Sequence, residues 1–383
     1  MKTTINFLLV LFLVSNSISA QVKYENFQST KLGEERQIKI QLPRGYNANE
    51  EKSYPVFVVL DGDYLFEAVA GNVDYYSYWE DMPEAIVVGV NQAETQYDDC
   101  LYSEQNSLPV EAGARFFEFI GMELLPYIET NYRTVNFKVA VGHGNSANFI
   151  NYYLLKSNPL FQGYIVVSPE LAPLMLEYIP ESLTKIQSKI FYYLANSGAD
   201  SKSLKQMTEA LHTDLSAIEN ENLSYSFNSF ENSTHYSAPA HAIPNALQNM
   251  FNVFQPISKK QYKDEILELE ISPVVYLEEK YQAIKTLFGI DKQILINDFR
   301  AIAAAIEKNE LFEYYEPLGK LARKQYPKTL LGNYYLGRFY EETGEPKKAM
   351  KTYQSAYTFD EIAGITKDKV LELADTIKAD FGY

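Results

Sequence analysis

The chain has 383 residues, with 34 Lys or Arg against 50 Asp or Glu, so its formal net charge is −16. This acidity argues against a nucleic-acid partner or an anionic membrane surface, because both require clustered basic side chains. The single cysteine, Cys100, excludes an intrachain disulfide, and there are only four histidines. A Cys-based zinc site and a His-rich metal centre are therefore not expected, and we expect no metal and no cofactor.

The first twenty residues have the features of a signal peptide. Lys2 is followed by the apolar run Ile5–Val14 and then by Ser17-Ile18-Ser19-Ala20, which ends in a small residue suited to cleavage. An N-terminal membrane anchor is the alternative interpretation. We expect cleavage after Ala20 and export to a periplasm or to the exterior. No later stretch is long and apolar enough to span a bilayer, so none is expected in the mature chain.

Residues 21–257 alternate between strand-like and helix-like segments, which predicts a mostly parallel sheet with helices on both faces. Short runs of β-branched residues are typical of strands that are covered on both sides. The predicted strands are 37–42, 55–60, 85–90, 137–141, 164–167, 190–194 and 225–230, and the predicted helices are 111–132, 148–155, 203–218 and 240–254. Ligands of such sheets bind at the carboxyl ends of the strands.

Residues 258–383 contain no strand-like run and are rich in helix formers. One window has the spacing of a 34-residue tetratricopeptide unit that begins near Leu330. It is carried by Leu336, Gly337, Tyr340, Gly344, Ala349, Tyr353 and Ala356, with a degraded neighbour at Ala322 and Pro327. A plain helical hairpin is the alternative. Because a repeat buries its apolar face only against a neighbour, we expect this region to pack on itself or on the sheet domain.

The predicted strand that ends at Val141 runs into Gly142-His143-Gly144-Asn145-Ser146 and then into a helix. This is the frame of a G-x-S-x-G nucleophile elbow, a sharp turn that projects a serine hydroxyl above the sheet. Gly144 holds the central position here, and Ser146 stands where the last glycine is usual. Glycine has no oxygen, so no acyl-enzyme is expected at this position. Ser146 is either a displaced nucleophile or a helix-start residue that bonds a free backbone N–H.

Across most of residues 25–255 the chain resembles the putative esterase (esterase D-like) family of the α/β-hydrolase superfamily. The resemblance is carried by LPRGY (42–46), YPV and LDGD (within 54–63), MPE and IVVGV (within 82–90), the segment 119–134, VGH (141–143) and SP (168–169). It implies the three-layer sandwich of an α/β-hydrolase, and ester or acyl hydrolysis by a serine, a histidine and an acid. It also implies the helical, tetratricopeptide-like tail that exported bacterial relatives often carry.

The resemblance assigns candidate site residues one by one. It implies His235 as the base and Asp200 as the acid that orients it, with His241 an alternative base and Glu209 or Asp214 alternative acids. The oxyanion donors would be the backbone N–H of Asn145 and one from the Gly62-Asp63 loop. The residues expected beside the pocket are His143, Ser146 and Ser168. The chain departs from the family at 91–95, which lacks an Arg, and at 170–173, where Glu170-Leu171-Ala172-Pro173 replaces Ser-Leu-Trp-Trp.

Three functional hypotheses follow. The first is an exported, catalytically impaired esterase-like protein that binds an ester-like small molecule or a partner. The second is an active ester hydrolase that uses water activated by His235, or a non-standard serine. The third is an adaptor that recruits a protein through its helical tail. The aromatic run Tyr75, Tyr76, Tyr78 and Trp79 either lines a pocket for a sugar or acyl group or belongs to the core and rim of the sheet.

Overall fold

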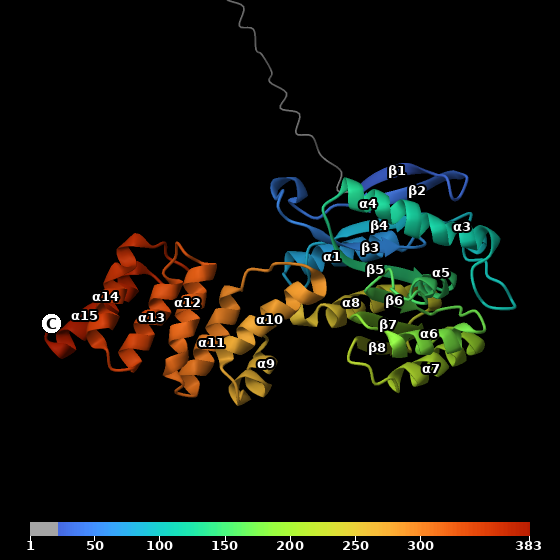
Figure 1. The fold of residues 1–383 in the computed structure, drawn as a ribbon. Helices are drawn as coiled ribbons and strands as arrows, with labels where there is room; N and C mark the ends of the chain where they lie inside the picture. The colour runs from blue at the N-terminus through green and yellow to red at the C-terminus, as the bar shows by residue number, and fades with distance from the viewer. Residues whose placement is uncertain (1–21) are drawn as a thin grey trace, which may run out of the picture.

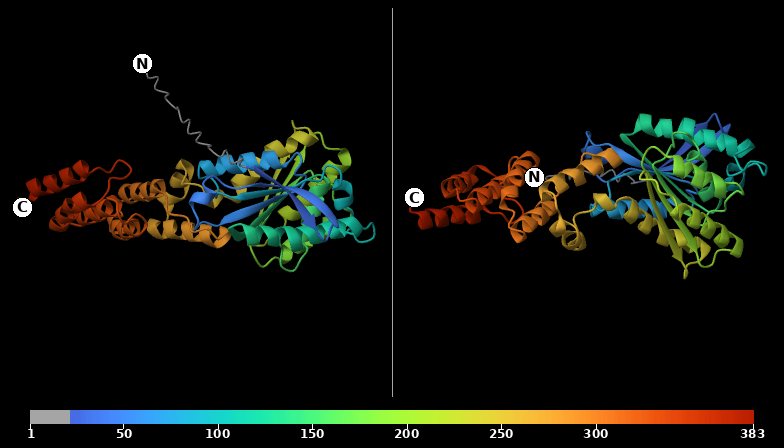
Figure 2. Two further views of the ribbon diagram at one scale, coloured as in Figure 1. Left: turned by 90° about the horizontal axis from the view of Figure 1, so that it is seen from above. Right: turned by 60° about the horizontal axis from the view of Figure 1, so that its bottom comes forward.

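The computed structural model describes residues 22–383, and the expected signal peptide lies outside this range. A twisted sheet with helices on both faces is followed by an elongated all-helical region that extends away from it (Figures 1 and 2). The fold class expected from the sequence, a mostly parallel α/β sandwich followed by an all-α region, is confirmed. Among residues 22–383, no helix combines the length and the apolarity needed to cross a bilayer.

The sheet has eight strands in the order β1-β2-β4-β3-β5-β6-β7-β8. Strands β1 and β2 form an antiparallel pair, β2 is antiparallel to β4, and all other neighbours are parallel. The strands are β1 (Val22–Ser29), β2 (Glu34–Gln41), β3 (Tyr54–Val59), β4 (Ile86–Val90), β5 (Thr134–His143), β6 (Gly163–Val167), β7 (Ile190–Ser197) and β8 (Leu223–Phe230). The carboxyl ends of the parallel strands therefore meet at one edge of the sheet, where β5 ends at His143.

Two hydrophobic layers sandwich the sheet. One face is covered by α1 (Phe66–Tyr78) and α8 (Ala238–Met250), and part of the helical region joins the same core. The other face is covered by the continuous helix α3 (Glu111–Phe119), η2 (Ile120–Leu124) and α4 (Leu125–Asn131), and by α5 (Asn145–Ile150), α6 (Met175–Lys185) and α7 (Lys202–Ser216). The predicted helix over 111–132 is thus present, with a π-helical turn in its middle.

The elements that the sequence does not predict include strand β1 and helices α1 and α6. Strand β1 is an edge strand whose exposed side chains include charged and polar residues, so it lacks the β-branched run of a central strand. Helix α1 is rich in aromatic and apolar residues around its whole circumference, which blurs its helical periodicity. Helix α6 contains Pro180, a residue that ordinarily argues against a helix interior.

The helical region comprises α9 (Lys259–Asp264), α10 (Pro273–Phe288), α11 (Ile296–Lys308), α12 (Tyr315–Gln325), α13 (Leu331–Glu342), α14 (Pro346–Gln354) and α15 (Lys367–Phe381). Helices α13 and α14 form the hairpin expected over the 34-residue window. The small and aromatic positions Ala349, Tyr353 and Ala356 are fully buried there. Its assignment as a tetratricopeptide unit stays a prediction.

Helix α10 joins the helical region to the sheet domain. The ring of Phe288 lies 5.0 Å from those of Phe137 in β5 and Phe251 after α8, and 6.0 Å from that of Phe191 in β7. Asp298 in α11 also fixes the chain segment around Ile257, which leads from the sheet domain into the helical region. Its buried carboxylate accepts from Lys280 Nζ at 3.0 Å and from the backbone N–H of Ile257 at 2.9 Å. The helical region therefore packs on the sheet domain as well as on itself.

We expect Phe288→Ala to lower the free energy of unfolding by about 3–5 kcal/mol, because it removes a fully buried ring and leaves a cavity between the two regions. Urea unfolding followed by circular dichroism measures the loss. Phe381→Ala is the matched control, since the Phe381 ring is exposed and should change stability by less than about 0.5 kcal/mol. Equal effects of the two substitutions would contradict this docking.

Candidate active site

The elbow is built by a close approach of α5 to the end of β5. A Cβ on Gly142 would lie 2.6 Å from the carbonyl carbon of Ser146, so only glycine fits there. At Gly144 the backbone turns with φ 61° and ψ −121°, a conformation that L side chains rarely adopt. The turn is held from the neighbouring strand, because the Gly144 N–H donates to the carbonyl of Val167 at 3.0 Å. The expected strand–turn–helix frame is thus present.

The space above Gly144 is bordered by two polar side chains. A Cβ built on Gly144 would lie 3.9 Å from Nε2 of His235 and 3.7 Å from Oε1 of Glu170, which are ordinary van der Waals distances. A side chain therefore fits in this space. A serine oxygen one bond further out would come within hydrogen-bonding range of His235, about 3 Å.

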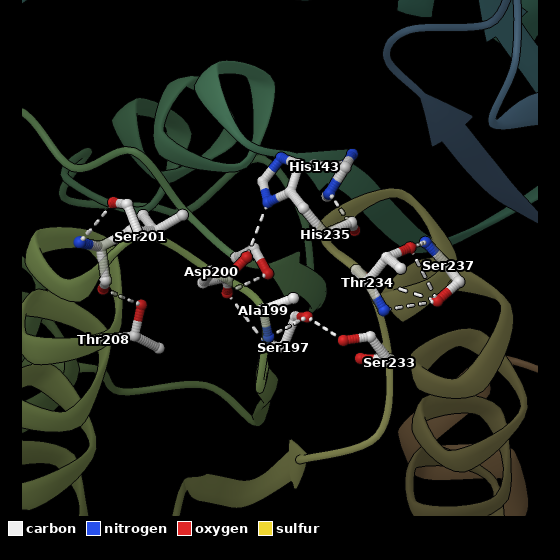
Figure 3. Close-up of polar contacts among 12 residues, drawn as sticks. His143, Ser197, Ala199, Asp200, Ser201, Thr208, Ser233, Thr234, His235 and Ser237 are labelled. Atoms are coloured by element: carbon white, nitrogen blue, oxygen red, sulfur yellow. Dashed lines mark hydrogen bonds and ion pairs between the residues drawn. The ribbon is translucent and has the colours of Figure 1, made fainter.

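His235 is oriented by a buried carboxylate (Figure 3). Its Nδ1 lies 2.7 Å from Oδ1 of Asp200, whose side chain is fully buried. The second oxygen, Oδ2, accepts from the hydroxyl of Ser168 at 2.7 Å and from the N–H of Ser197 at 2.9 Å. His235 begins a short 3₁₀ turn that is capped by the side chain of Thr234. These bonds fix the carboxylate, and the carboxylate fixes the imidazole.

The alternative acids and the alternative base lie elsewhere. Glu209 and Asp214 are exposed on α7, and His241 is exposed on α8, where its ring stacks on Phe230. The structure therefore brings together Asp200 and His235, and brings none of the three alternatives into this pair.

His143 lies beneath His235, with ring centroids 4.4 Å apart. Its Nε2 is 3.1 Å from the carbonyl oxygen of His235, and its Nδ1 is 3.0 Å from the hydroxyl of Tyr64. Burial and, to a smaller extent, the nearby His235 lower the pKa of His143 to about 4. The ring is therefore neutral at pH 7, with Nε2 donating to the His235 carbonyl and Nδ1 accepting from Tyr64.

Ser146 supports the elbow from inside. Its fully buried hydroxyl donates to Oδ2 of Asp61 at 2.5 Å and accepts from the backbone N–H of His143 at 2.9 Å. The oxygen thus bonds a backbone N–H, as one interpretation of the sequence expects, and is not directed at His235. Asp61 also accepts from Nε2 of Gln96 at 2.6 Å, and burial raises the pKa of Asp61 to about 6. His143, Ser146 and Ser168 are all buried, so they form the support of the site rather than an open lining.

The backbone N–H groups of the expected oxyanion hole differ in whether they already have a hydrogen-bond acceptor. Asn145 is the first residue of α5, where N–H groups have no intrahelical acceptor. The N–H of Gly62, in contrast, donates to the carbonyl of Val90 at 2.8 Å. Asp63 follows it, and its carboxylate accepts from the N–H of Gln92 at 2.6 Å. Of the two expected loop donors, the N–H of Gly62 is therefore already bonded within the sheet domain, which leaves that of Asp63 as the candidate.

Three residues of the site carry no role in the sequence analysis. Glu170 is visible there only as a departure from the family pattern, and Tyr64 and Ser197 are not singled out. Ser197 ends β7 three residues before Asp200, so a turn that bonds the acid is readable in principle. Within residues 22–383, no group of three or more His, Cys, Asp or Glu side chains is arranged to hold a metal ion.

Comparisons with known proteins identify the family of the chain. A family model described as Putative esterase matches residues 29–237. The crystal structure of an uncharacterised protein from Capnocytophaga ochracea DSM 7271 is 32% identical, with a TM-score of 0.86, and the match covers 94% of this chain and all of that one. Such coverage includes both the sheet and the helical region.

More distant structures share the fold. The IroE-like serine hydrolase from Shewanella oneidensis is 22% identical, with a TM-score of 0.60 over 78% of this chain and 98% of that one. The BES protein from Bacillus cereus is 20% identical, with a TM-score of 0.52 over 60% and 96%. No curated protein matches the chain significantly.

We expect His143 to make folding stability depend on pH. Below pH 6.5 the unfolded chain protonates this imidazole, while the folded chain keeps it neutral down to about pH 4. The stabilisation is therefore complete above pH 6.5 and is lost as the pH falls towards 4. Asp61 changes the folding stability in the opposite direction over the same pH range, because its raised pKa favours the folded state at low pH. The contribution of His143 is therefore measured against a variant.

The difference in unfolding free energy between pH 7.5 and pH 4.5 should be about 2–3 kcal/mol smaller in His143→Gln than in the natural protein. Urea titrations at the two pH values measure it. His241→Gln, which changes an exposed histidine away from the site, should keep the natural difference. If His143→Gln keeps it too, the imidazole of His143 titrates normally in the folded chain.

Proposed function

The chain belongs to the putative esterase family, and from this premise we propose that it binds an ester-like ligand or a partner without forming an acyl-enzyme. The observation that carries the proposal is Gly144 itself. It occupies the turn to which the Asp200–His235 pair points, and it supplies no hydroxyl there. We include export in the proposal, because residues 1–20 have the pattern of a signal peptide.

The missing hydroxyl removes one chemical step and leaves others. Loss of one triad member lowers the rate by orders of magnitude, whereas an oxyanion hole and substrate binding alone leave about 10³–10⁴-fold over water. A carbonyl group can still be held by the N–H groups at the elbow, and His235 can still accept a proton. The covalent intermediate is what the chain lacks, so ligand retention is favoured over turnover.

Glu170 adds a second obstacle to ordinary ester hydrolysis. Its N–H donates to the carbonyl of Gly144 at 3.0 Å, so its backbone is clamped to the elbow, and its carboxylate borders the same space. A tetrahedral intermediate places negative charge on oxygen in this space, and a neighbouring carboxylate opposes that charge. The family pattern that the chain resembles has a neutral serine at position 170. Gly144 and Glu170 therefore both disfavour ester hydrolysis through an acyl-enzyme.

Gly144→Ser should create activity, because the rest of the triad is in place. We expect the variant to hydrolyse p-nitrophenyl acetate faster than the natural protein and to be labelled by a fluorophosphonate at the introduced hydroxyl. Gly144→Ser with Glu170→Ser should be about tenfold faster again, which corresponds to about 1.4 kcal/mol of barrier. Both variants should lose about 1–3 kcal/mol of stability, since a side chain is strained at φ 61°.

Gly144→Ala is the matched control, because it carries the same backbone strain without a hydroxyl. It should show neither labelling nor a gain in hydrolysis. Two results would contradict the proposal. One is labelling of the natural protein at any serine near the elbow. The other is a folded Gly144→Ser variant, normal by circular dichroism, that is neither labelled nor active.

A second candidate function is hydrolysis by activated water, and it rests on the two proton acceptors that border the space above Gly144. A water held there by Nε2 of His235 and Oε1 of Glu170 would lose a proton to one of them as its oxygen bonds to the ester carbonyl carbon. The bond to the alkoxide then breaks, and the proton passes to the leaving alcohol. The products are the acid and the alcohol, with no covalent enzyme intermediate.

The hydrolysis rates of two variants separate the two candidates. Hydrolysis by activated water predicts turnover that shows no burst, resists fluorophosphonate and falls at least about 100-fold in both His235→Ala and Glu170→Gln. The first proposal predicts instead that the natural protein shows no more than the residual rate left by an oxyanion hole and substrate binding, and that neither substitution lowers it. His241→Ala is the control for an effect of removing any histidine.

A further inference from the structure

A large cleft lies far from the elbow, between the sheet domain and the helical region. Its volume is about 1220 Å³. Val135, at the start of β5, lines it, whereas Gly144 follows the end of the same strand. Because a ten-residue strand is about 30 Å long, the cleft and the elbow are separate places. Its walls come from the end of α1, with Ser77 and Tyr78, and from the segment that follows α10, residues 289–297.

An aromatic pair forms part of the wall on the sheet-domain side. Tyr78 and Trp79, at the end of α1, are each 59% exposed, although large apolar rings usually avoid water. Their rings pack edge to face with centroids 5.1 Å apart. Arg44 lies 5.1 Å from the Tyr78 ring and is held by two hydrogen bonds to Asp74, at 2.7 and 2.6 Å. The exposed rings are thus held in place.

The opposite wall carries a partly buried amine. Nζ of Lys292 lies 3.6 Å from the centroid of the Phe254 ring and donates to the Phe254 carbonyl at 2.7 Å. Burial lowers the pKa of Lys292 to about 8, so the amine is mostly protonated at pH 7. Among residues 22–383, no carboxylate forms an ion pair with Lys292, and the Phe254 carbonyl uses one of its three N–H groups. The amine can therefore donate to a ligand.

The charges of the whole lining, Lys292 included, nearly cancel. Three basic and four acidic side chains line the cleft, and several are paired, as Lys52 is with Glu84 at 3.1 Å. A polyanion would find no excess of positive charge there. A wholly apolar ligand would leave the amine and the carboxylates buried without partners. The lining therefore suits a neutral ligand that has both an apolar face and groups that donate and accept hydrogen bonds.

We propose that this cleft binds a neutral oligosaccharide. Sugar rings have a C–H face that stacks on exposed aromatic side chains such as Tyr78 and Trp79. Their hydroxyls accept from an ammonium such as Lys292 and donate to carboxylates such as Glu80. The volume of the cleft accommodates several sugar units. The site is independent of the elbow, so it stands whether or not the protein hydrolyses esters.

Trp79 is the only tryptophan of the chain, so intrinsic fluorescence reports on this cleft directly. We would titrate the full-length protein with cellohexaose, xylohexaose, laminarihexaose, mannohexaose and chitohexaose. At least one should give a saturable blue shift of the emission and protect Trp79 from acrylamide quenching. Lys292→Met, which keeps the tryptophan, should weaken that binding at least tenfold. Lys351→Met, at an exposed lysine away from the cleft, should not.

Calorimetry extends the test to Trp79→Ala, which should also bind at least tenfold more weakly, with Tyr357→Ala as the control for loss of an exposed aromatic ring. The proposal is overturned if no member of the panel shifts the emission or protects Trp79. It is also overturned if binding survives unchanged in both cleft variants, or if only an acidic polysaccharide such as heparin binds.

Discussion

The close approach of α5 to the end of β5 is the constraint on which the site depends. Because Gly142 has no side chain, α5 can begin directly after the end of β5. In this tight turn residue 144 takes φ 61°. A serine at residue 144 would hold this conformation at a cost of about 1–3 kcal/mol. Glycine holds it without that strain. A chain released from the need for a nucleophile therefore gains stability from glycine while keeping the same turn.

The groups beneath the elbow survive for a reason that is independent of catalysis. The Asp200 carboxylate, the neutral ring of His143 and the hydroxyl of Ser146 are buried, and each is hydrogen-bonded to a neighbouring segment of the site. Removing one of them would leave a buried polar partner unsatisfied, at about 1–3 kcal/mol. Packing therefore favours Asp200, His143 and Ser146 whether or not the chain turns over an ester. The presence of the Asp200–His235 pair does not by itself indicate turnover. Turnover depends on whether a nucleophilic oxygen occupies the space above Gly144.

The sequence predicts those features that depend on local pattern. The β-branched runs locate β3 to β7, and the glycines around His143 locate the elbow, because strand burial and tight turns each need particular residues in order. The position of Glu170 cannot be predicted from local sequence pattern. Glu170 is adjacent to Gly144 only because β6 pairs with β5, so the topology places its backbone near the elbow. The direction of its carboxylate depends on the positive φ of Ser168 and on the bond to Gly144, which no pattern encodes. Likewise, the docking of α10 depends on Phe288, one ring at the end of a helix.

The docking of α10 on the sheet domain also bears on the hypothesis that the helical region is an adaptor. An adaptor tail that merely hangs from a scaffold would share little core with it, whereas the ring of Phe288 completes an aromatic cluster with Phe137 and Phe251. Without α10, these rings on the sheet would face water, so the sheet domain depends on the helical region for part of its core. The same contact builds the cleft, since it brings Lys292 opposite α1. Any ligand of the cleft must touch both regions at once, and its binding would therefore stabilise their junction.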